Sequence, residues 1–298
     1  MTEKKTKRTT AEIMAAGKLK AEAAKARKTE EPIKSRQSDN FSLELWPESA
    51  RGVPNVLLRN ALFGIATERK VYQSRTLIAS TRDVEIRFMG VGFNQTDLDV
   101  FEMVLHLARL QPLGQTFEFS ARELLLALGR GTGKAQYEQL KDELMRLVSG
   151  GVEITFLEAK KSFMGTLVRH IKRDDDTKRY AVRFEDDLLK LFGEGFTLTD
   201  WAQRQALGKN NLAKWLQGQY ATHAKPYPVK VETLHRLSGS EATLNKFREK
   251  LKVALDELVR VGSLKSWEIL PGDLVSVQAV SSQSQLKHLS RSRKADTA

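Results

Sequence analysis

The sequence contains no cysteine, and this absence excludes several classes of protein. Without thiols the chain has no disulfide framework, no thiolate metal site and no cysteine nucleophile. No apolar run is long enough to span a membrane, and the start MTEKKTKRTT lacks the apolar stretch of a secretory signal. We therefore expect a soluble protein of a reducing cytoplasm.

The chain also lacks the residues of common catalytic and cofactor sites. GRGTGKA at 129–135 resembles a phosphate-binding loop, but Leu128 stands at the first glycine position and Ala135 replaces the Ser or Thr that would hold Mg²⁺. His170 and Arg173 match a fragment of the tyrosine recombinase signature, but Tyr180 lies too close to them. No closely spaced pair for a metal-dependent nicking site occurs among the five histidines, at 106, 170, 223, 235 and 288. We predict no catalytic residue, no bound metal and no cofactor.

Positive charge is in excess and gathers at the ends of the chain. The net charge is +12; residues 1–40 hold eleven Lys or Arg against six Asp or Glu, and residues 279–298 hold four against one. Such tails attract polyanions, because each cation that neutralises a phosphate releases condensed counterions. The alternative is a solubilising role without a specific partner. We interpret 1–40 as a basic tail, disordered or weakly helical, and 281–298 as a second disordered basic tail.

A segment of the chain occurs twice, about 110 residues apart. Leu125 and Leu128 match Leu234 and Leu237 at an offset of 109, and Tyr137 matches Phe247 at 110. The offset reaches 111 for four further pairs, in which Leu144, Leu147, Val148 and Gly151 match Leu255, Leu258, Val259 and Gly262. This change of offset by two residues falls in the turn between two helices. Such a change is typical of a duplicated domain, in which loop length can vary while helix packing is kept. With 298 residues, the length also favours about two domains.

The first copy predicts helices followed by a β-hairpin. Residues 41–63 supply core side chains, namely Trp46, Leu57, Leu58, Leu62 and Phe63, and 83–91 alternates as a strand. Thr96 or Asp97 can cap a helix that ends near Arg109, with an apolar face of Leu98, Phe101, Val104, Leu105 and Leu107. A capping box, Ser120 with Glu123, begins a helix over 120–128, and a glycine-rich turn leads to a helix over 134–149. Strands are expected at 151–158, 163–172 and 178–184.

The second copy predicts the same order. Helices are expected at 210–223, 231–237 and 242–261, and strands at 264–270 and 274–280. Between the copies, 184–205 is interpreted as a short helix and a connecting loop. This order of helices with a hairpin after the third predicts an α+β protein of two tandem winged-helix domains, over 41–195 and 196–280.

Candidate DNA-binding residues follow from that arrangement. On the helix at 242–261, the residues left outside the apolar stripe are of the mixed polar types that suit base edges: Asn245, Lys246, Arg248, Glu249 and Lys252. The corresponding helix of the first copy exposes Glu138, Asp142 and Glu143, so its contacts are expected from the turn at Arg130, Thr132 and Lys134, and from Lys141. A basic hairpin adds phosphate contacts from Arg169, Lys172, Arg173, Lys178, Arg179 and Arg183. The alternatives are an ordinary solvated helix face and, in the hairpin, pairing with Asp174–Asp176, which we interpret as a solvated turn.

With both copies placed, the chain resembles the TrfA-type plasmid replication initiators over about residues 41–278. The resemblance is densest in WPESARGVPNVLLRNALF, FEDDLLKLF and HAKPYPVKVETLHRLSGSEATLNKFREKLKVALDELVRVG. It implies a bacterial DNA-associated protein that binds direct repeats (iterons) in double-stranded DNA at a plasmid origin, helps to open adjacent A·T-rich DNA and recruits the host replicative helicase and initiator proteins. It also implies that monomers bind the repeats and that dimers are less active.

One segment departs from the family pattern. Members can carry a sliding-clamp motif just before the Trp-Pro segment, and the matching positions here are Asn40, Phe41, Ser42, Leu43 and Glu44. Glu44 stands where an apolar anchor belongs, which argues against clamp binding; Ser42 and Leu43 could instead cap and pack an early helix.

The leading hypothesis from the sequence is therefore a noncatalytic origin-binding initiator. A winged-helix transcriptional regulator or autorepressor is the alternative, and a nuclease or recombinase would need residues that the sequence does not offer.

Overall fold

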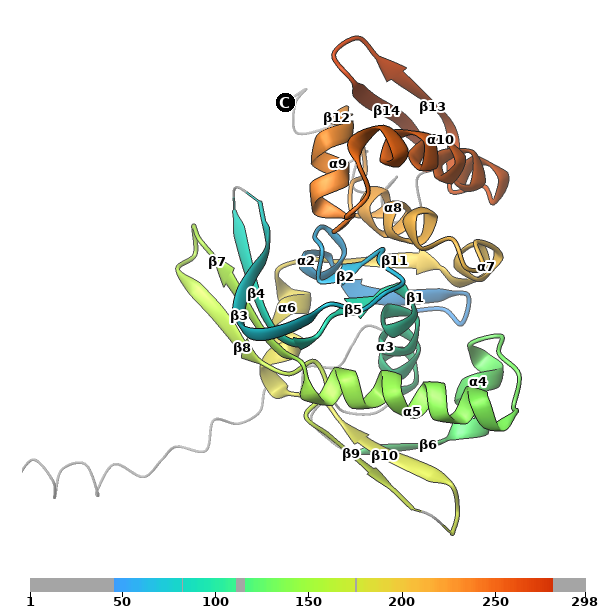
Figure 1. Cartoon of the computed structure of the whole chain (residues 1–298). Helices are drawn as coiled ribbons and strands as arrows, with labels where there is room; N and C mark the ends of the chain where they lie inside the picture. Colours follow the sequence, from blue (N-terminus) through green and yellow to red (C-terminus); the bar gives the residue numbers. More distant parts are fainter. Residues whose placement is uncertain (1–45, 82, 111–115, 175, 281–298) are drawn as a thin grey trace, which may run out of the picture. The chain divides into compact units, whose positions relative to one another are not determined.

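Two halves of the chain share one order of helices and strands (Figure 1). The computed structural model describes residues 46–81, 83–110, 116–174 and 176–280, which all belong to one unit, Ser42–Ala298. The predicted tails at 1–40 and 281–298, and the segment Asn40–Glu44, lie outside the described residues.

The first half contains a helix, a strand, two further helices and a hairpin. These are α3 (Gln95–Ala108), β6 (Phe117–Ser120), α4 (Ala121–Ala127), α5 (Lys134–Ser149), β9 (His170–Arg173) and β10 (Arg179–Arg183). The second half repeats them as α8 (Asn211–Ala221), β12 (Val229–Lys230), α9 (Val231–Leu237), α10 (Leu244–Arg260), β13 (Leu264–Leu270) and β14 (Leu274–Ala279). The three strands of each half form an antiparallel sheet whose middle strand is the last in sequence, in the orders β6-β10-β9 and β12-β14-β13.

The first half carries an insertion that the sequence did not reveal. After α5 the chain forms β7 (Gly151–Phe156) and β8 (Lys161–Gly165), which join β3 (Val71–Ser80) and β4 (Val84–Val91) in a four-stranded sheet of order β3-β4-β7-β8. The single strand predicted over 163–172 is therefore wrong. Its two ends pair in different sheets, because Phe163 lies opposite Ile154 and Ile171 lies opposite Val182.

The segment predicted as a helix and a loop between the copies is more ordered than expected. It forms α6 (Asp186–Gly193), β11 (Phe196–Asp200) and α7 (Trp201–Ala206). β11 pairs with β1 (Ala50–Pro54), so the loop prediction is wrong for this strand. The remaining elements, α2 (Asn55–Leu58), β2 (Phe63–Gly64) and β5 (Phe93–Asn94), complete the first half, with β2 parallel to β5.

Of two helix starts predicted from capping residues, that of α4 is confirmed and that of α3 differs. Ser120 caps α4: its hydroxyl accepts from the Glu123 amide and the Glu123 carboxylate accepts from the Ser120 amide, both at 3.1 Å, which confirms the capping box. The Ser120 amide bond also lowers the pKa of Glu123. α3 begins earlier than predicted, because its cap is Asn94 and neither Thr96 nor Asp97. The Asp97 carboxylate accepts a hydrogen bond from the Asn94 amide.

The duplication is visible in the turn after each short helix. Gly129 and Gly239 adopt left-handed backbone, with φ of +69° and +68°. In both copies the amide after the glycine donates a hydrogen bond to the carbonyl five residues earlier. Arg130 donates to Leu125, and Ser240 donates to His235. Glycine meets this conformation without a steric penalty, so both turns need it.

The matched apolar positions form the cores of the two halves. Leu144 and Leu147 are buried in the first core, and their counterparts Leu255 and Leu258 are buried in the second. All five residues of 41–63 that the sequence assigned to a core are buried, and of the apolar face predicted for α3 only Leu107 is half-buried.

Buried charges join the halves. Arg204 of α7 is 1% exposed; its Nε lies 2.7 Å from Asp99 Oδ1 and 3.2 Å from Glu102 Oε2, both on α3. Lys214 of α8 donates to Asp99 Oδ2 at 2.6 Å, and Gln95 Oε1 accepts from Arg204 Nη2 at 3.0 Å. These side chains, which we call the α3 ionic cluster, connect the first helix of each half through α7.

Removal of Arg204 should therefore destabilise the whole unit. Arg204→Gln leaves the carboxylates of Asp99 and Glu102 buried with Lys214 as their remaining cation, and is expected to cost about 3–5 kcal/mol of unfolding free energy. Urea denaturation measures this loss. The matched control is Arg260→Gln, which removes an exposed partner of Glu257 and should cost less than about 1 kcal/mol. Equal effects of the two substitutions would contradict the role given to the cluster.

The same cluster predicts a pH dependence. Burial raises the pKa of Glu102 from 4.5 to about 7, against the opposing charge of Arg204. The folded state thus binds the Glu102 proton more tightly than the unfolded chain does. Protonation of Glu102 therefore contributes up to about 3 kcal/mol to the free energy of unfolding. This contribution is full below about pH 4.5 and is lost as the pH rises through about 7. The measurement is the difference in unfolding free energy between the wild type and Glu102→Gln from pH 4.5 to 7.5. A difference that does not vary with pH would contradict the assignment.

Candidate nucleic-acid interface

The predicted DNA-binding residues fall on three surfaces, two in the first half and one in the second. The α5 surface comprises the turn before α5 and the start of that helix; the β9–β10 hairpin provides the second surface and helix α10 the third. α5 contacts β9, so the first two surfaces lie on elements that pack together.

On the α5 surface, the predicted residues differ in their exposure to solvent and in their ion pairing. Thr132, Lys134 and Lys141 are exposed. Arg130 is largely buried, and its Nη1 lies 2.5 Å from Oε2 of Glu143, whose side chain is fully buried. Gln139 Nε2 donates to the other oxygen of Glu143 at 3.0 Å.

The expectation that Glu143 is exposed is therefore wrong. Glu138 and Asp142 are exposed as expected, but Glu143 lies on the inner side of α5, where Arg130 neutralises it. A buried carboxylate needs such a partner. The contribution of Arg130 to DNA binding stays a prediction, and the structure gives this side chain an internal role.

The hairpin surface presents most of its cations to solvent. Arg169, Lys172, Arg173 and Lys178 are exposed, while Arg179 and Arg183 are half-buried. Arg179 Nε lies 3.3 Å from Glu118 Oε2, and Arg169 Nη1 lies 3.8 Å from Glu185 Oε2. Within the described ranges, Lys172 and Lys178 have no carboxylate at ion-pair distance.

The acidic turn of this hairpin is organised by its own backbone. The Asp174 carboxylate accepts from the amides of Asp176 and Thr177 at 2.8 and 2.9 Å. These bonds, that from Thr177 foremost, lower the pKa of Asp174. Lys178, with φ of +56°, follows directly. Asp174 is thus engaged with its own turn.

On α10, the apolar and polar faces separate as predicted. Phe247, Leu251, Ala254, Leu255 and Leu258 are buried, whereas Asn245, Lys246, Glu249 and Lys252 are exposed. Arg248 differs: it is half-buried and forms a bidentate pair with Asp273, Nε to Oδ1 at 3.1 Å and Nη2 to Oδ2 at 2.7 Å. This contact raises the pKa of Arg248 and lowers that of Asp273.

Sequence patterns did not point to Asp273 as the partner of Arg248. The two residues are 25 positions apart and belong to different periodic segments. Lys265 on β13 and Arg122 on α4 are further exposed cations that periodicity did not single out.

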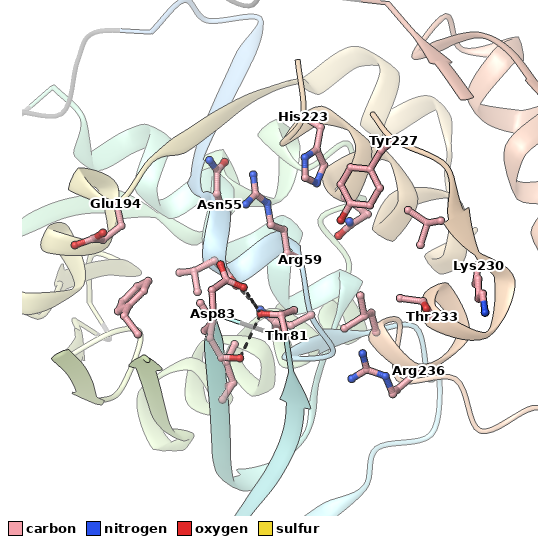
Figure 2. A pocket seen from close by; sticks show the side chains of 18 of the residues that line it. Asn55, Arg59, Thr81, Asp83, Glu194, His223, Tyr227, Lys230, Thr233 and Arg236 are labelled. Carbon is pink, nitrogen blue, oxygen red and sulfur yellow. Dashed lines mark hydrogen bonds between the residues drawn. The ribbon is translucent and has the colours of Figure 1, made fainter. Parts of the chain in front are cut away.

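A cavity of about 760 Å³ lies apart from the three surfaces (Figure 2). None of the predicted DNA-binding residues lines it. Figure 2 shows that both halves line it: the first half contributes Arg59, Thr81 and Asp83, and the second half contributes His223, Tyr227 and Arg236. Several of its polar groups bond to neighbours: Arg59 donates to the hydroxyl and carbonyl of Thr222, each at 2.9 Å, and Thr81 donates to Asp83 at 2.9 Å.

Among the described residues, no group of three or more His, Asp or Glu is placed to hold a metal ion. Within the same residues, no helix combines the length and the apolar character needed to cross a membrane.

Known proteins match most of the chain. A model of the TrfA protein family matches residues 5–278. The plasmid replication initiator protein TrfA of Escherichia coli is 28% identical over 246 residues, which are 80% of this chain and 64% of that protein. The chain thus spans less than two thirds of the length of this relative.

The fold resembles that of two crystal structures of domains 2 and 3 of RctB. One has a TM-score of 0.50 and covers 78% of this chain, and the other has a TM-score of 0.52 and covers 76%. Each match is 12% identical and covers 98% of the RctB chain, so the likeness concerns the fold alone.

The internal role of Arg130 can be separated from a DNA contact by its effect on stability. Arg130→Ala leaves the Glu143 carboxylate buried without its cation and is expected to lower the unfolding free energy by about 3 kcal/mol. Lys134→Ala, at an exposed neighbouring position, is the control and should change it by less than about 0.5 kcal/mol. Chemical denaturation without DNA compares the two. Unchanged stability of Arg130→Ala would show that the pair with Glu143 is dispensable.

Proposed function

The chain belongs to the TrfA family, and from this we propose that it is a plasmid replication initiator that binds direct repeats at a replication origin. In this proposal each half is a winged-helix domain, the first ending near residue 195 and the second spanning 196–280. α5 and α10 are the recognition helices, and the hairpins β9–β10 and β13–β14 are the wings. The repeated order of elements, with the same strand order in both small sheets, is the observation that carries the proposal.

The chemistry of the surfaces supports two kinds of DNA contact. The exposed lysines of α5 and of the β9–β10 hairpin suit phosphates, which hold a protein on DNA without regard to sequence. On α10, Asn245 and Glu249 can hydrogen-bond to base edges in the major groove. Because the two halves carry different side chains, their combined footprint is asymmetric, which suits directly repeated sites better than palindromes.

Further steps belong to the same proposal. Binding of the repeats would precede opening of neighbouring A·T-rich DNA and recruitment of the host helicase and initiator proteins, with monomers as the active form. These steps rest on the family and on the E. coli relative.

Binding to repeat-bearing duplexes tests the proposal. We expect the protein to prefer duplexes with direct repeats of its own plasmid over scrambled duplexes of equal composition by a factor of about 10³ or more. Lys172→Ala with Lys178→Ala should weaken binding to both duplexes and reduce the slope of log affinity against log salt by about 2, since two phosphate contacts are lost. Asn245→Ala should reduce the preference for the repeats and leave that slope unchanged. Fluorescence anisotropy over a salt series measures all three.

Equal affinity of the wild type for both duplexes would reject the proposal. A replication assay separates the remaining alternative. A plasmid that carries the origin but lacks the initiator gene should replicate only when the chain is supplied. Specific binding with promoter repression and without replication would identify a transcriptional regulator instead.

A further inference from the structure

All three nitrogen atoms of the Arg248 guanidinium are engaged within the second half. Nε and Nη2 donate to the two oxygens of Asp273, and Nη1 donates to Asn245 Oδ1 at 3.0 Å. The side chain is 33% exposed and that of Asp273 is 35% exposed, so solvent reaches this pair but does not surround it. A planar guanidinium held at three points is oriented by the protein, unlike a flexible surface cation.

Asp273 connects this guanidinium to the turn of the second wing. It follows Gly272 in the β13–β14 turn, and the two have φ of +62° and +81°. Its backbone carbonyl accepts from the Val231 amide at the start of α9, at 3.0 Å. The wing turn is therefore fixed to α9 by its backbone and to α10 by its side chain.

We propose that Arg248 is a positioning residue, which holds the second wing against α10 and orients the Asn245 amide toward DNA. This inference rests on the proposed function and replaces the base-contacting role that the sequence assigned to Arg248. Arginine offers donors only, so the Asn245 atom that faces it is the oxygen. The Asn245 Nδ2 group is left to donate to acceptors on a base edge, such as N7 or O6 of guanine or O4 of thymine.

The two roles of Arg248 make opposite predictions for Asp273→Asn. If Arg248 contacted DNA itself, loss of the competing carboxylate would free the cation, and binding would strengthen or stay constant. If Arg248 positions the wing and Asn245, the same substitution removes its anchor and weakens recognition. Asparagine accepts left-handed backbone well, so the turn itself is preserved.

Matched substitutions separate the positioning role of Arg248 from effects of net charge and of folding. Glu257→Gln also removes one carboxylate from an ion pair on α10, that with Arg260, but this pair does not reach the wing. Arg248→Lys keeps the charge and loses the two-point contact with Asp273. Positioning predicts that Asp273→Asn and Arg248→Lys behave alike and that Glu257→Gln behaves as the wild type.

Two measurements decide the question. Anisotropy titrations should show that Asp273→Asn and Arg248→Lys reduce the preference for repeat over scrambled duplexes about fivefold, a value typical for loss of one hydrogen bond. Hydrogen exchange of the free protein should show faster exchange of the amides of Leu270 and of 272–274 in both variants and not in Glu257→Gln. Unchanged exchange, or binding by Asp273→Asn that equals or exceeds that of the wild type, would overturn the inference. If the wild type shows no preference for repeats, the proposed function fails, and the exchange result still tests the connection between Arg248 and the wing.

Discussion

Burial of carboxylates along α3 is the constraint on which the arrangement of the chain depends. Asp97 is fully buried and pairs with Arg69 and with Arg146 of α5, at 2.9 Å in the second case. Asp99 and Glu102 pair with α7 and α8. A buried ion pair adds little stability compared with apolar packing, but loss of one partner is costly, so each carboxylate specifies where its cation must lie. α3 thereby fixes the helices around it by charge as well as by shape.

The same constraint reaches both proposed recognition helices, α5 and α10, through α7. Gln205 donates to the Ala127 carbonyl at the end of α4, at 3.2 Å, while Gln203 accepts from the Ser263 hydroxyl just beyond α10, at 2.7 Å. Arg204 between them is held by α3. A six-residue helix thus touches the turn before α5 and the end of α10. The relation between the two proposed DNA-binding surfaces is therefore set by short contacts and not by a free linker.

Local chemistry was predictable from the sequence, and pairing across long separations was not. The capping box at Ser120, the helix at 231–237 and the apolar face of α10 each depend on residues within one or two turns of each other. The pairing of β1 with β11 joins residues about 150 positions apart. The division of 163–172 arises because its first end follows β7 into a sheet with β4, about 70 positions earlier, whereas its second end pairs with β10 in another sheet. Buried Glu143 resembles a solvated residue in sequence, because its partner Arg130 precedes the helix. One signal was available: Gln95, Asp99, Glu102 and His106 form a polar stripe at helical spacing on α3.

In the candidate interface, arginines and lysines differ in whether they form ion pairs within the chain. Among the predicted arginines, Arg130, Arg169, Arg179 and Arg248 each pair with a carboxylate of the chain itself. The predicted lysines, at 134, 141, 172, 178, 246 and 252, are exposed and have no such pair within the described residues. Guanidinium groups suit two-point contacts in fixed geometry, whereas ammonium groups are mobile point charges. In the proposed interface, arginine therefore shapes the surface and lysine is the candidate for phosphate contacts. On this proposal, affinity depends on salt through lysine, whereas specificity depends on how rigidly arginine holds the few polar groups proposed to face the bases.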